Sequence, residues 1–126
     1  MRALLAALVL AGPALAQDKT AFGTWQTEPA ARAAPLHVYV APCSYDTARV
    51  CGQIVRAKDD AGDALVGRAI ITGMLADDDG GWQDGQLWVP EEDRTYRATM
   101  RLDGDALTVT GCVALFCRSQ SWTRVE

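Results

Sequence analysis

Four cysteines, Cys43, Cys51, Cys112 and Cys117, are the residues whose chemistry the sequence states most directly. Neither close pair has the C-x-x-C spacing of a thiolate metal site, and the single histidine, His37, cannot supply a histidine-rich site. We therefore expect no metal ion and no cofactor. An even cysteine count in an exported chain, which the N-terminus indicates below, predicts two disulfides. Three pairings are possible, and we expect the two local ones, because each joins the ends of a predicted hairpin.

The other residues that could do chemistry form no recognisable catalytic set. His37 lies in an alternating apolar stretch without a nucleophile motif, so we expect a strand residue rather than a general base. The acidic stretches 59–63 and 77–79 lack the glutamate of an EF-hand, which favours solvated turns. Glu91 and Glu92 follow Pro90 in a predicted turn, where neighbouring side chains diverge. The sequence therefore predicts a binding protein rather than an enzyme.

The aromatic residues have two possible roles, which are to fill a core or to contact a ligand. The four tryptophans are Trp25, Trp82, Trp88 and Trp122. Tyr96 follows the turn at 90–94 and has the inward parity of Ala98, whereas Trp88 leads into the same turn from the partner strand. We predict that Trp88, Tyr96 and Trp122 form a ligand-binding mouth. Trp88 and Tyr96 on facing strands would then grip an amphipathic molecule.

The elements that must position these residues are short strands, because apolar residues alternate with polar ones along most of the chain. Residues 95–102 alternate throughout, and Asp103-Gly104 then predicts a tight turn into the next strand. We expect eight strands, at 22–27, 36–41, 50–57, 69–75, 86–89, 95–102, 106–111 and 119–125. Closure into an antiparallel barrel would remove exposed strand edges, and a sandwich is the structural alternative.

The N-terminus has the pattern of a signal peptide. A positive start at Met1-Arg2 precedes an apolar run that is too short to span a bilayer, and Ala14-Leu15-Ala16 predicts a cleavage site. We expect a signal peptide at 1–16 and one β-barrel domain at 17–126. The basic residues are scattered through a chain of net charge −4, which argues against nucleic-acid binding. The mature protein is expected to be a periplasmic or secreted monomer without a membrane span.

Gly23-x-Trp25 in the first predicted strand and Arg124 in the last resemble the lipocalin-like (calycin) barrels. In that superfamily the glycine-x-tryptophan lies where the barrel begins, and an arginine from the end of the chain packs over the indole. The resemblance implies a small antiparallel barrel that Gly23, Trp25 and Arg124 help to close. Arg118 is the second choice for the arginine.

A wider resemblance covers nearly the whole mature chain. The segments that carry it are GTWQTE, CSYDTARVCGQIV, GGWQDGQLWVPEEDRTY and GDALTVTGCVALFCRSQSWTR. They resemble a family of small exported bacterial proteins known only as a domain of unknown function. This chain departs from the family pattern at Trp88, where tyrosine is usual, at Val89, where aspartate is usual, and at Asp93, where glycine is usual. The Asn-Pro-Asp segment expected before Arg68 is also missing. The family implies a barrel and export, and it implies no activity.

Two functions follow from these residues and resemblances. The first is an exported, non-catalytic binding module that holds a small apolar or amphipathic ligand at the barrel mouth. The alternative is a protein-binding module, such as an inhibitor of an envelope or secreted hydrolase, whose acidic balance would suit a basic partner. A hollow apolar cavity would favour the first function, whereas a filled barrel with a projecting acidic or aromatic loop would favour the second.

Overall fold

The computed structural model describes residues 20–29, 34–57 and 64–125. The predicted signal peptide at 1–16 and the acidic stretch 59–63 lie outside the described residues. Within these ranges, no helix has the length and apolar character needed to cross a membrane.

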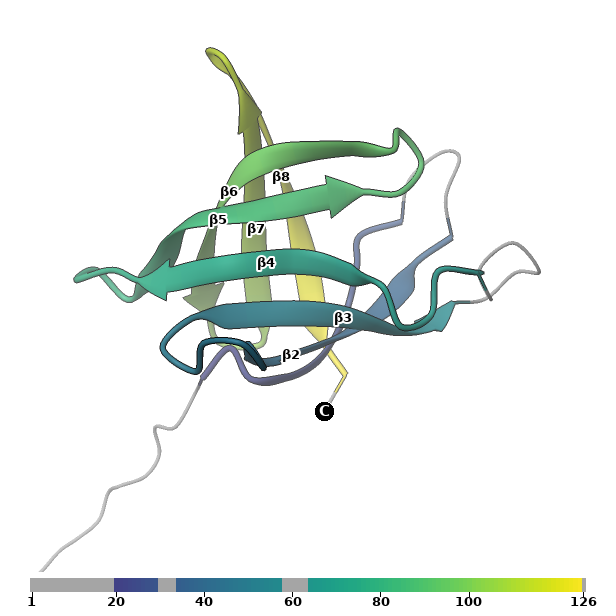
Figure 1. Cartoon of the computed structure of the whole chain (residues 1–126), viewed down its shortest axis with the longest axis horizontal. Helices are drawn as coiled ribbons and strands as arrows, with labels where there is room; N and C mark the ends of the chain where they lie inside the picture. The colour runs from purple at the N-terminus through teal and green to yellow at the C-terminus, as the bar shows by residue number, and fades with distance from the viewer. Residues whose placement is uncertain (1–19, 30–33, 58–63, 126) are drawn as a thin grey trace, which may run out of the picture.

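Eight antiparallel strands form a closed barrel in which each strand pairs with the next and β1 pairs with β8. The strands are β1 (Gly23–Gln26), β2 (Leu36–Pro42), β3 (Val50–Ala57), β4 (Ala69–Ala76), β5 (Gly81–Val89), β6 (Arg94–Asp103), β7 (Ala106–Val113) and β8 (Phe116–Arg124). Strands β3, β4 and β5 cross the front of the molecule, and β7 and β8 run steeply behind them (Figure 1). The barrel prediction is confirmed, and the sandwich alternative is wrong.

Alternation along the strands decides which side chains enter the barrel. On β6, Tyr96, Ala98 and Met100 are buried, whereas the residues between them are exposed. The register between β6 and β7 places Met100 opposite Val109, which is also fully buried. The largest side chains with almost no solvent exposure are Trp25, Val38, Val40, Ile54, Ile71, Met74, Leu107, Val109 and Trp122. Burying each large aliphatic side chain contributes about 1.5–3 kcal/mol, so this interior is the main source of stability.

Strand β5 is longer than predicted, because it begins at Gly81 rather than at residue 86. Its first half does not alternate, and its pairing with β6 shifts between Trp82 and Gly85. Asp84 in this irregular stretch has φ 62°, in the left-handed region. Gly85 then passes so close to β4 that an added Cβ would lie 2.6 Å from the Met74 Sδ. Glycine is therefore required where β4 and β5 approach each other.

Both predicted disulfides are present. Cys43 and Cys51 are joined across the β2–β3 connection, and Cys112 and Cys117 are joined across the β7–β8 hairpin. In each case a bridge closes a short ring, which limits the conformations of the unfolded chain and stiffens the connection in the folded one. Two disulfides are typical of proteins that fold in an oxidising, extracytoplasmic compartment.

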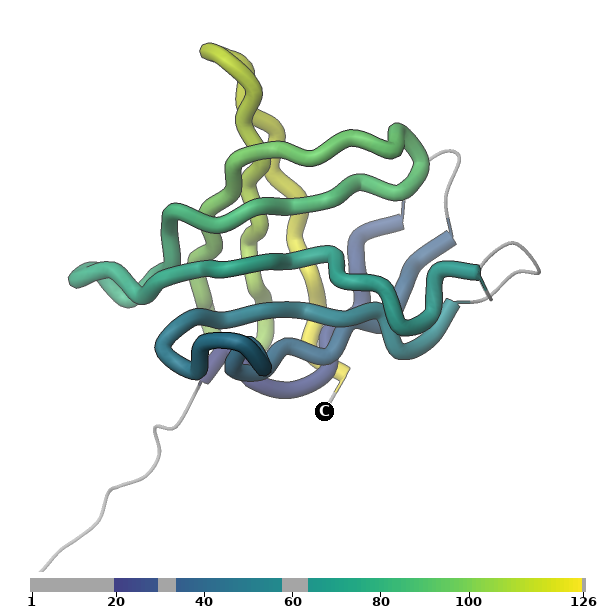
Figure 2. Tube along the Cα trace, in the orientation of Figure 1, coloured from purple at the N-terminus to yellow at the C-terminus, as the bar shows by residue number. Residues whose placement is uncertain are grey.

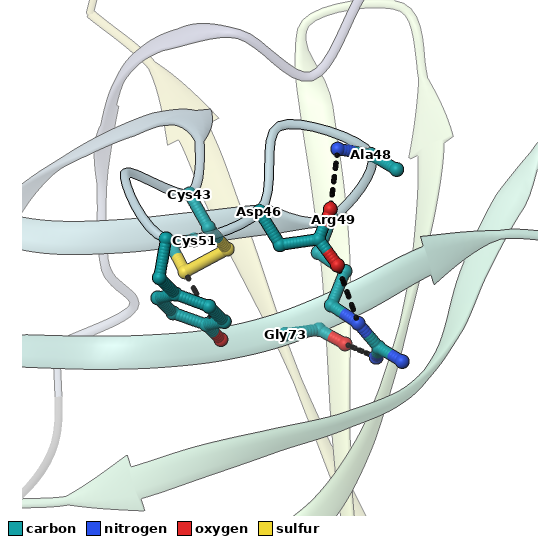
Figure 3. Close-up of a disulfide and its surroundings, with 7 residues drawn as sticks. Cys43, Asp46, Ala48, Arg49, Cys51 and Gly73 are labelled. Carbon is teal, nitrogen blue, oxygen red and sulfur yellow. Dashed lines mark hydrogen bonds and ion pairs between the residues drawn. A yellow bond between two sulfur atoms is a disulfide. The ribbon is translucent and has the colours of Figure 1, made fainter.

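Hydrogen bonds and an ion pair also fasten the β2–β3 connection (Figure 3). The Asp46 carboxylate accepts a hydrogen bond of 3.0 Å from the Ala48 N–H and forms an ion pair of 3.4 Å with Arg49. The Arg49 guanidinium in turn donates to the Gly73 carbonyl of β4 at 2.9 Å. The loop is therefore tied to a strand that is not its neighbour in sequence.

The seam between β1 and β8 depends on side chains as much as on backbone pairing. The register across it consists of Trp25 opposite Arg124 and Gln26 opposite Thr123. The Arg124 guanidinium carbon lies 4.4 Å from the centroid of the fully buried Trp25 ring, which is the arrangement that the resemblance to lipocalin-like barrels implies. The indole N–H of Trp25 donates to the Ala21 carbonyl at 2.8 Å. Trp25 thus closes this end of the barrel beneath a cation.

Arg124 also holds the chain before β1. Its guanidinium donates to the carbonyls of Thr20 at 2.7 Å and Phe22 at 3.1 Å, and it pairs with the Asp105 carboxylate at 3.3 Å. Its side chain is only 20% exposed, so these contacts are partly desolvated. One arginine therefore connects the last strand, the first strand and the β6–β7 turn.

We predict that Arg124→Ala lowers the free energy of unfolding by about 2 kcal/mol, since it removes a partly desolvated cation–π contact and charged hydrogen bonds. Arg56→Ala, at an exposed position on β3, is the matched control and should change it by no more than about 0.5 kcal/mol. Arg124→Lys should recover only part of the loss, because an ammonium cannot stack on the indole or donate two hydrogen bonds from one plane as a guanidinium does. Urea denaturation of the three variants measures this, and equal losses for Arg124→Ala and Arg56→Ala would contradict it.

Candidate functional site

The two ends of the barrel differ because antiparallel strands place alternate connections at opposite ends. The β1–β2, β3–β4, β5–β6 and β7–β8 connections share one end, here called the barrel mouth, opposite the end that Trp25 and Arg124 close. A hollow of about 170 Å³ lies at the mouth. The lining includes the buried residues Leu87, Val89 and Tyr96 and the charged residues Glu28, Glu91 and Arg118. The mouth thus combines an apolar inner wall with a charged rim.

Tyr96 is the aromatic residue in the lining of this hollow. It lies on β6 opposite Leu87 of β5, and its exposed fraction is 9%. Gly111 on β7 makes room for it, since an added Cβ there would lie 3.1 Å from the Tyr96 Cβ and 3.3 Å from a Leu87 methyl carbon. The barrel wall is therefore shaped to hold a large ring at the mouth.

A hydrogen-bonded network joins the β5–β6 turn to β6 and β8. The Tyr96 hydroxyl donates to one carboxylate oxygen of Glu92. The Arg118 guanidinium donates to the other oxygen at 2.7 Å and lies 3.4 Å from the Tyr96 hydroxyl oxygen. The hydrogen bond from Tyr96, and then the one from Arg118, lower the pKa of Glu92 below its ordinary value. The carboxylate is therefore held ionised, and the tyrosine ring is anchored at its hydroxyl.

Trp122 lies deeper than Tyr96 and belongs to the core. Its exposed fraction is 1%, and its indole N–H donates to the Gln120 side-chain oxygen at 2.6 Å. Trp122 and Gln120 border a second hollow of about 50 Å³ at the same end, which Trp88 also borders. Trp122 thus fills the barrel and reaches the mouth at the same time.

Trp88 does not face Tyr96, so this part of the sequence prediction is wrong. The register pairs Leu87 with Tyr96 and Trp88 with Thr95, and successive side chains on a strand point to opposite faces. Trp88 therefore lies on the other face of the sheet, where the Arg68 guanidinium carbon is 4.0 Å from its ring centroid. The apolar Leu87 on one side of Trp88 and Val89 on the other are the signal that could have shown this parity.

Three contacts around the mouth go beyond what the sequence predicts. Arg118, the second choice for the Trp25 site, instead contacts Glu92 and Tyr96 at the mouth. The Glu92 carboxylate bonds to both Tyr96 and Arg118, and the Arg68 guanidinium covers the Trp88 ring. Each contact joins residues whose proximity depends on the register of strands or on how a loop returns, and no local pattern encodes either.

The remaining candidates behave as structural residues. Asp77 accepts hydrogen bonds from the N–H groups of Gly81 at 2.9 Å and Asp79 at 2.8 Å, which lower its pKa and shape the β4–β5 turn. His37 lies on β2 with its Nε2 3.2 Å from the Gln26 side-chain oxygen. In the described ranges, no group of three histidine, cysteine, aspartate or glutamate residues is arranged to hold a metal ion.

Two larger hollows lie on the outer surface of the barrel. One of about 490 Å³ borders Tyr39 and Tyr45 over β2 to β4, and one of about 360 Å³ borders Gln83 and Arg97 over β5 and β6. Their lining comes from outward-facing side chains and strand backbone. The mouth hollow is smaller, but it reaches the buried side chains Leu87 and Tyr96 and collects charged groups. We therefore take the mouth as the candidate site.

We predict that Glu92 stabilises the protein only above the pH at which it becomes protonated. Its pKa in the folded protein lies below the ordinary value of 4.5, so its contribution is present above that value and is lost as the pH falls through the lowered pKa. Glu92→Gln should therefore lower the Tm at about pH 7, and the Tm values of the two proteins should approach each other as the pH falls below 4.5. Asp78→Asn, at an exposed position, is the control and should leave the Tm unchanged across the same pH range. A constant Tm difference for Glu92→Gln across the range would contradict the prediction.

The comparisons with solved structures agree with the barrel. The protein HP1028 from the human pathogen Helicobacter pylori, described as belonging to the lipocalin family, superposes with a TM-score of 0.66 over 82% of each chain. The two sequences are 11% identical, so this likeness shows a lipocalin-like fold and nothing further. No curated protein matches the chain.

The match to a protein family covers every strand of the barrel. The family model, described as uncharacterized protein conserved in bacteria (DUF2147), matches residues 23–124. These residues begin at the first residue of β1 and end at the last residue of β8, so both partners of the Trp25–Arg124 seam are included. The chain therefore belongs to the DUF2147 family of bacterial proteins.

Proposed function

We propose that the protein is a periplasmic or secreted binding module that holds a small amphipathic ligand at the barrel mouth and does not catalyse a reaction. The observation that carries this proposal is the hollow of about 170 Å³ between buried apolar side chains and a charged rim. An amphipathic molecule would place its apolar part against Leu87 and Val89 and its polar part among the charged residues at the rim.

The size of the hollow supports a short ligand. Sites for drug-sized molecules usually occupy about 300–1,000 Å³, whereas this hollow occupies about 170 Å³. An eight-stranded barrel leaves room only for side chains or one small molecule, and here Trp122, Met74 and Leu107 already fill the interior. A ring or a short alkyl chain fits the remaining volume better than a long acyl chain.

The charges at the rim favour a ligand with a positive or hydrogen-bond-donating end. Glu28 and Glu91 border the hollow, and the single bordering cation among the described residues, Arg118, is already bonded to Glu92. A ligand carboxylate would meet two carboxylates and would share Arg118 with Glu92. An ammonium group would instead be attracted to Glu28 and Glu91.

The same network supports binding rather than catalysis. A general acid or base must be free to exchange a proton with a substrate. Glu92 has both oxygens engaged, one by Tyr96 and one by Arg118, and its lowered pKa keeps it ionised at neutral pH. The Glu92 carboxylate therefore holds the tyrosine in place.

We predict that hexylamine binds at the mouth with a Kd below about 1 mM, an affinity of about −4 kcal/mol, and that hexanoate binds more weakly. Titration followed by heteronuclear NMR should shift the indole N–H of Trp122 and the amide of Tyr96. No shift at either position, or shifts confined to the outer surface, would show that the aromatic residues only plug the barrel.

A variant that fills the mouth separates the site from the rest of the surface. Val89 lines both hollows at the mouth, so the larger side chain of Val89→Phe would occupy part of their space. This variant should weaken hexylamine binding at least tenfold. Val55→Phe makes the same change at a position on β3 that is 46% exposed, and it should leave the affinity unchanged. Equal affinities for Val89→Phe and the unmodified protein would place the ligand elsewhere.

A further inference from the structure

The tip of the β7–β8 hairpin projects beyond the other strands (Figure 2). This tip, here defined as Val113–Phe116, carries large apolar side chains that contact little of the protein. Leu115 is 95% exposed, Phe116 is 78% exposed and Val113 is 47% exposed. Single exposed apolar residues are ordinary, but three of them gathered on one projection usually mark an interaction site.

The tip is rigid. Cys112 and Cys117 are paired opposite each other and joined by a disulfide immediately before and after it. The Arg97 guanidinium, on the neighbouring β6, lies 3.5 Å from the Ala114 carbonyl oxygen and donates to it. A preordered loop loses little conformational entropy on binding, so its exposed side chains are presented at low cost.

The first charges next to the tip are positive. Residues 106–117 contain no charged side chain, and Arg118 follows directly. Arg97 lies opposite Cys112 on β6, so the base of the tip has an arginine on each side. Carboxylates lie close to Arg118, since Glu92 is paired with it and Glu28 and Glu91 line the same hollow. Arg97 has no carboxylate among the ion pairs of the described residues. The tip is therefore apolar at its end, and its base carries two arginines, of which Arg118 is paired with a carboxylate.

We propose that this tip inserts into the headgroup region of an anionic lipid bilayer. Leu115 and Phe116 would enter the boundary between headgroups and acyl chains, and Arg97 and Arg118 would contact lipid phosphates. The Arg118 side chain is 68% exposed, so its guanidinium can meet a phosphate while it remains bonded to Glu92. This surface shares Arg118 with the rim of the mouth hollow, but the inserted side chains of Leu115 and Phe116 do not line that hollow.

Size and shape favour a bilayer over a protein partner. A specific protein interface usually buries about 800 Å² on each side, in a patch of some 20–30 residues. The tip offers three apolar side chains on a convex projection, which is too small to form such an interface alone. A bilayer needs no complementary cleft, and the strength of binding follows from the apolar area that is inserted and from nearby basic charge.

The net charge of the protein restricts how this binding can occur. The chain carries a formal charge of −4, so an anionic surface repels the molecule as a whole. Salt at 0.1 M screens charges over about 10 Å, which leaves the residues at the contact to decide the interaction. An orientation that presents the tip first brings the exposed apolar side chains and the two arginines at its base to the surface.

Vesicle sedimentation tests the proposal with the full mature, oxidised protein. We expect binding to vesicles of 30% phosphatidylglycerol in phosphatidylcholine, and at least fivefold weaker binding to pure phosphatidylcholine. The double variant Leu115→Ser/Phe116→Ser should bind at least tenfold more weakly, since it removes both inserted side chains. Arg97→Gln should weaken binding about fivefold.

Tyr45→Ser is the matched control. Tyr45 is 66% exposed and lies on the β2–β3 connection at the opposite end of the barrel, so this variant should bind within about twofold of the unmodified protein. Circular dichroism and the Tm establish that each variant is folded. The proposal is overturned by the absence of binding at millimolar lipid, by equal binding to the two kinds of vesicle, or by equal losses in Tyr45→Ser and the double variant. Self-association or binding to a protein that the double variant abolishes, without vesicle binding, overturns it as well.

Discussion

The contact between Trp25 and Arg124 is the constraint on which the barrel depends. A sheet becomes a barrel only when its first and last strands meet, and β1 is the shortest strand, with four residues. Its register with β8 comprises two residue pairs, whereas β7 and β8 share eight. The seam is therefore weak in backbone hydrogen bonds and strong in side-chain contacts. The cation–π contact between the buried Trp25 indole and the Arg124 guanidinium stabilises the seam in place of backbone hydrogen bonds. The hydrogen bonds of Arg124 to Thr20 and Phe22 also fasten the chain before β1.

Closure at that end determines where a site can form. Trp25 occupies the closed end, and Met74, Leu107 and Trp122 fill the middle of the barrel. Space remains at the mouth, where Gly111 reduces the wall to backbone and Tyr96 takes the room that it leaves. The Glu92–Tyr96–Arg118 network then fixes the ring from the turn and from β8. The hollow is shallow because its inner boundary is the same set of side chains that stabilises the fold.

The sequence predicts the face of a strand better than the relation between strands. Alternation alone places Tyr96, Ala98 and Met100 inside, since β6 is regular over its whole length. Alternation fails in β5, where the irregularity before Gly85 interrupts the period of two. The first half of that strand therefore cannot be predicted from alternation. Alternation also cannot bring Glu92 to Arg118, because their contact depends on the registers of β6, β7 and β8 together. Both disulfides were predictable, because each closes a hairpin between neighbouring strands.

Asp93 and Trp88 stabilise each other on the exterior of the β5–β6 turn. Asp93 has φ 48°, a left-handed conformation that glycine adopts freely and that aspartate tolerates better than most residues. Aspartate at this position therefore carries a conformational cost. The Asp93 carboxylate accepts a hydrogen bond of 3.0 Å from the indole N–H of Trp88. This hydrogen bond offsets part of the strain and holds the ring beneath Arg68. The exterior of the turn is thus held by side chains on one face of the sheet, while Tyr96 lies on the other face at the mouth.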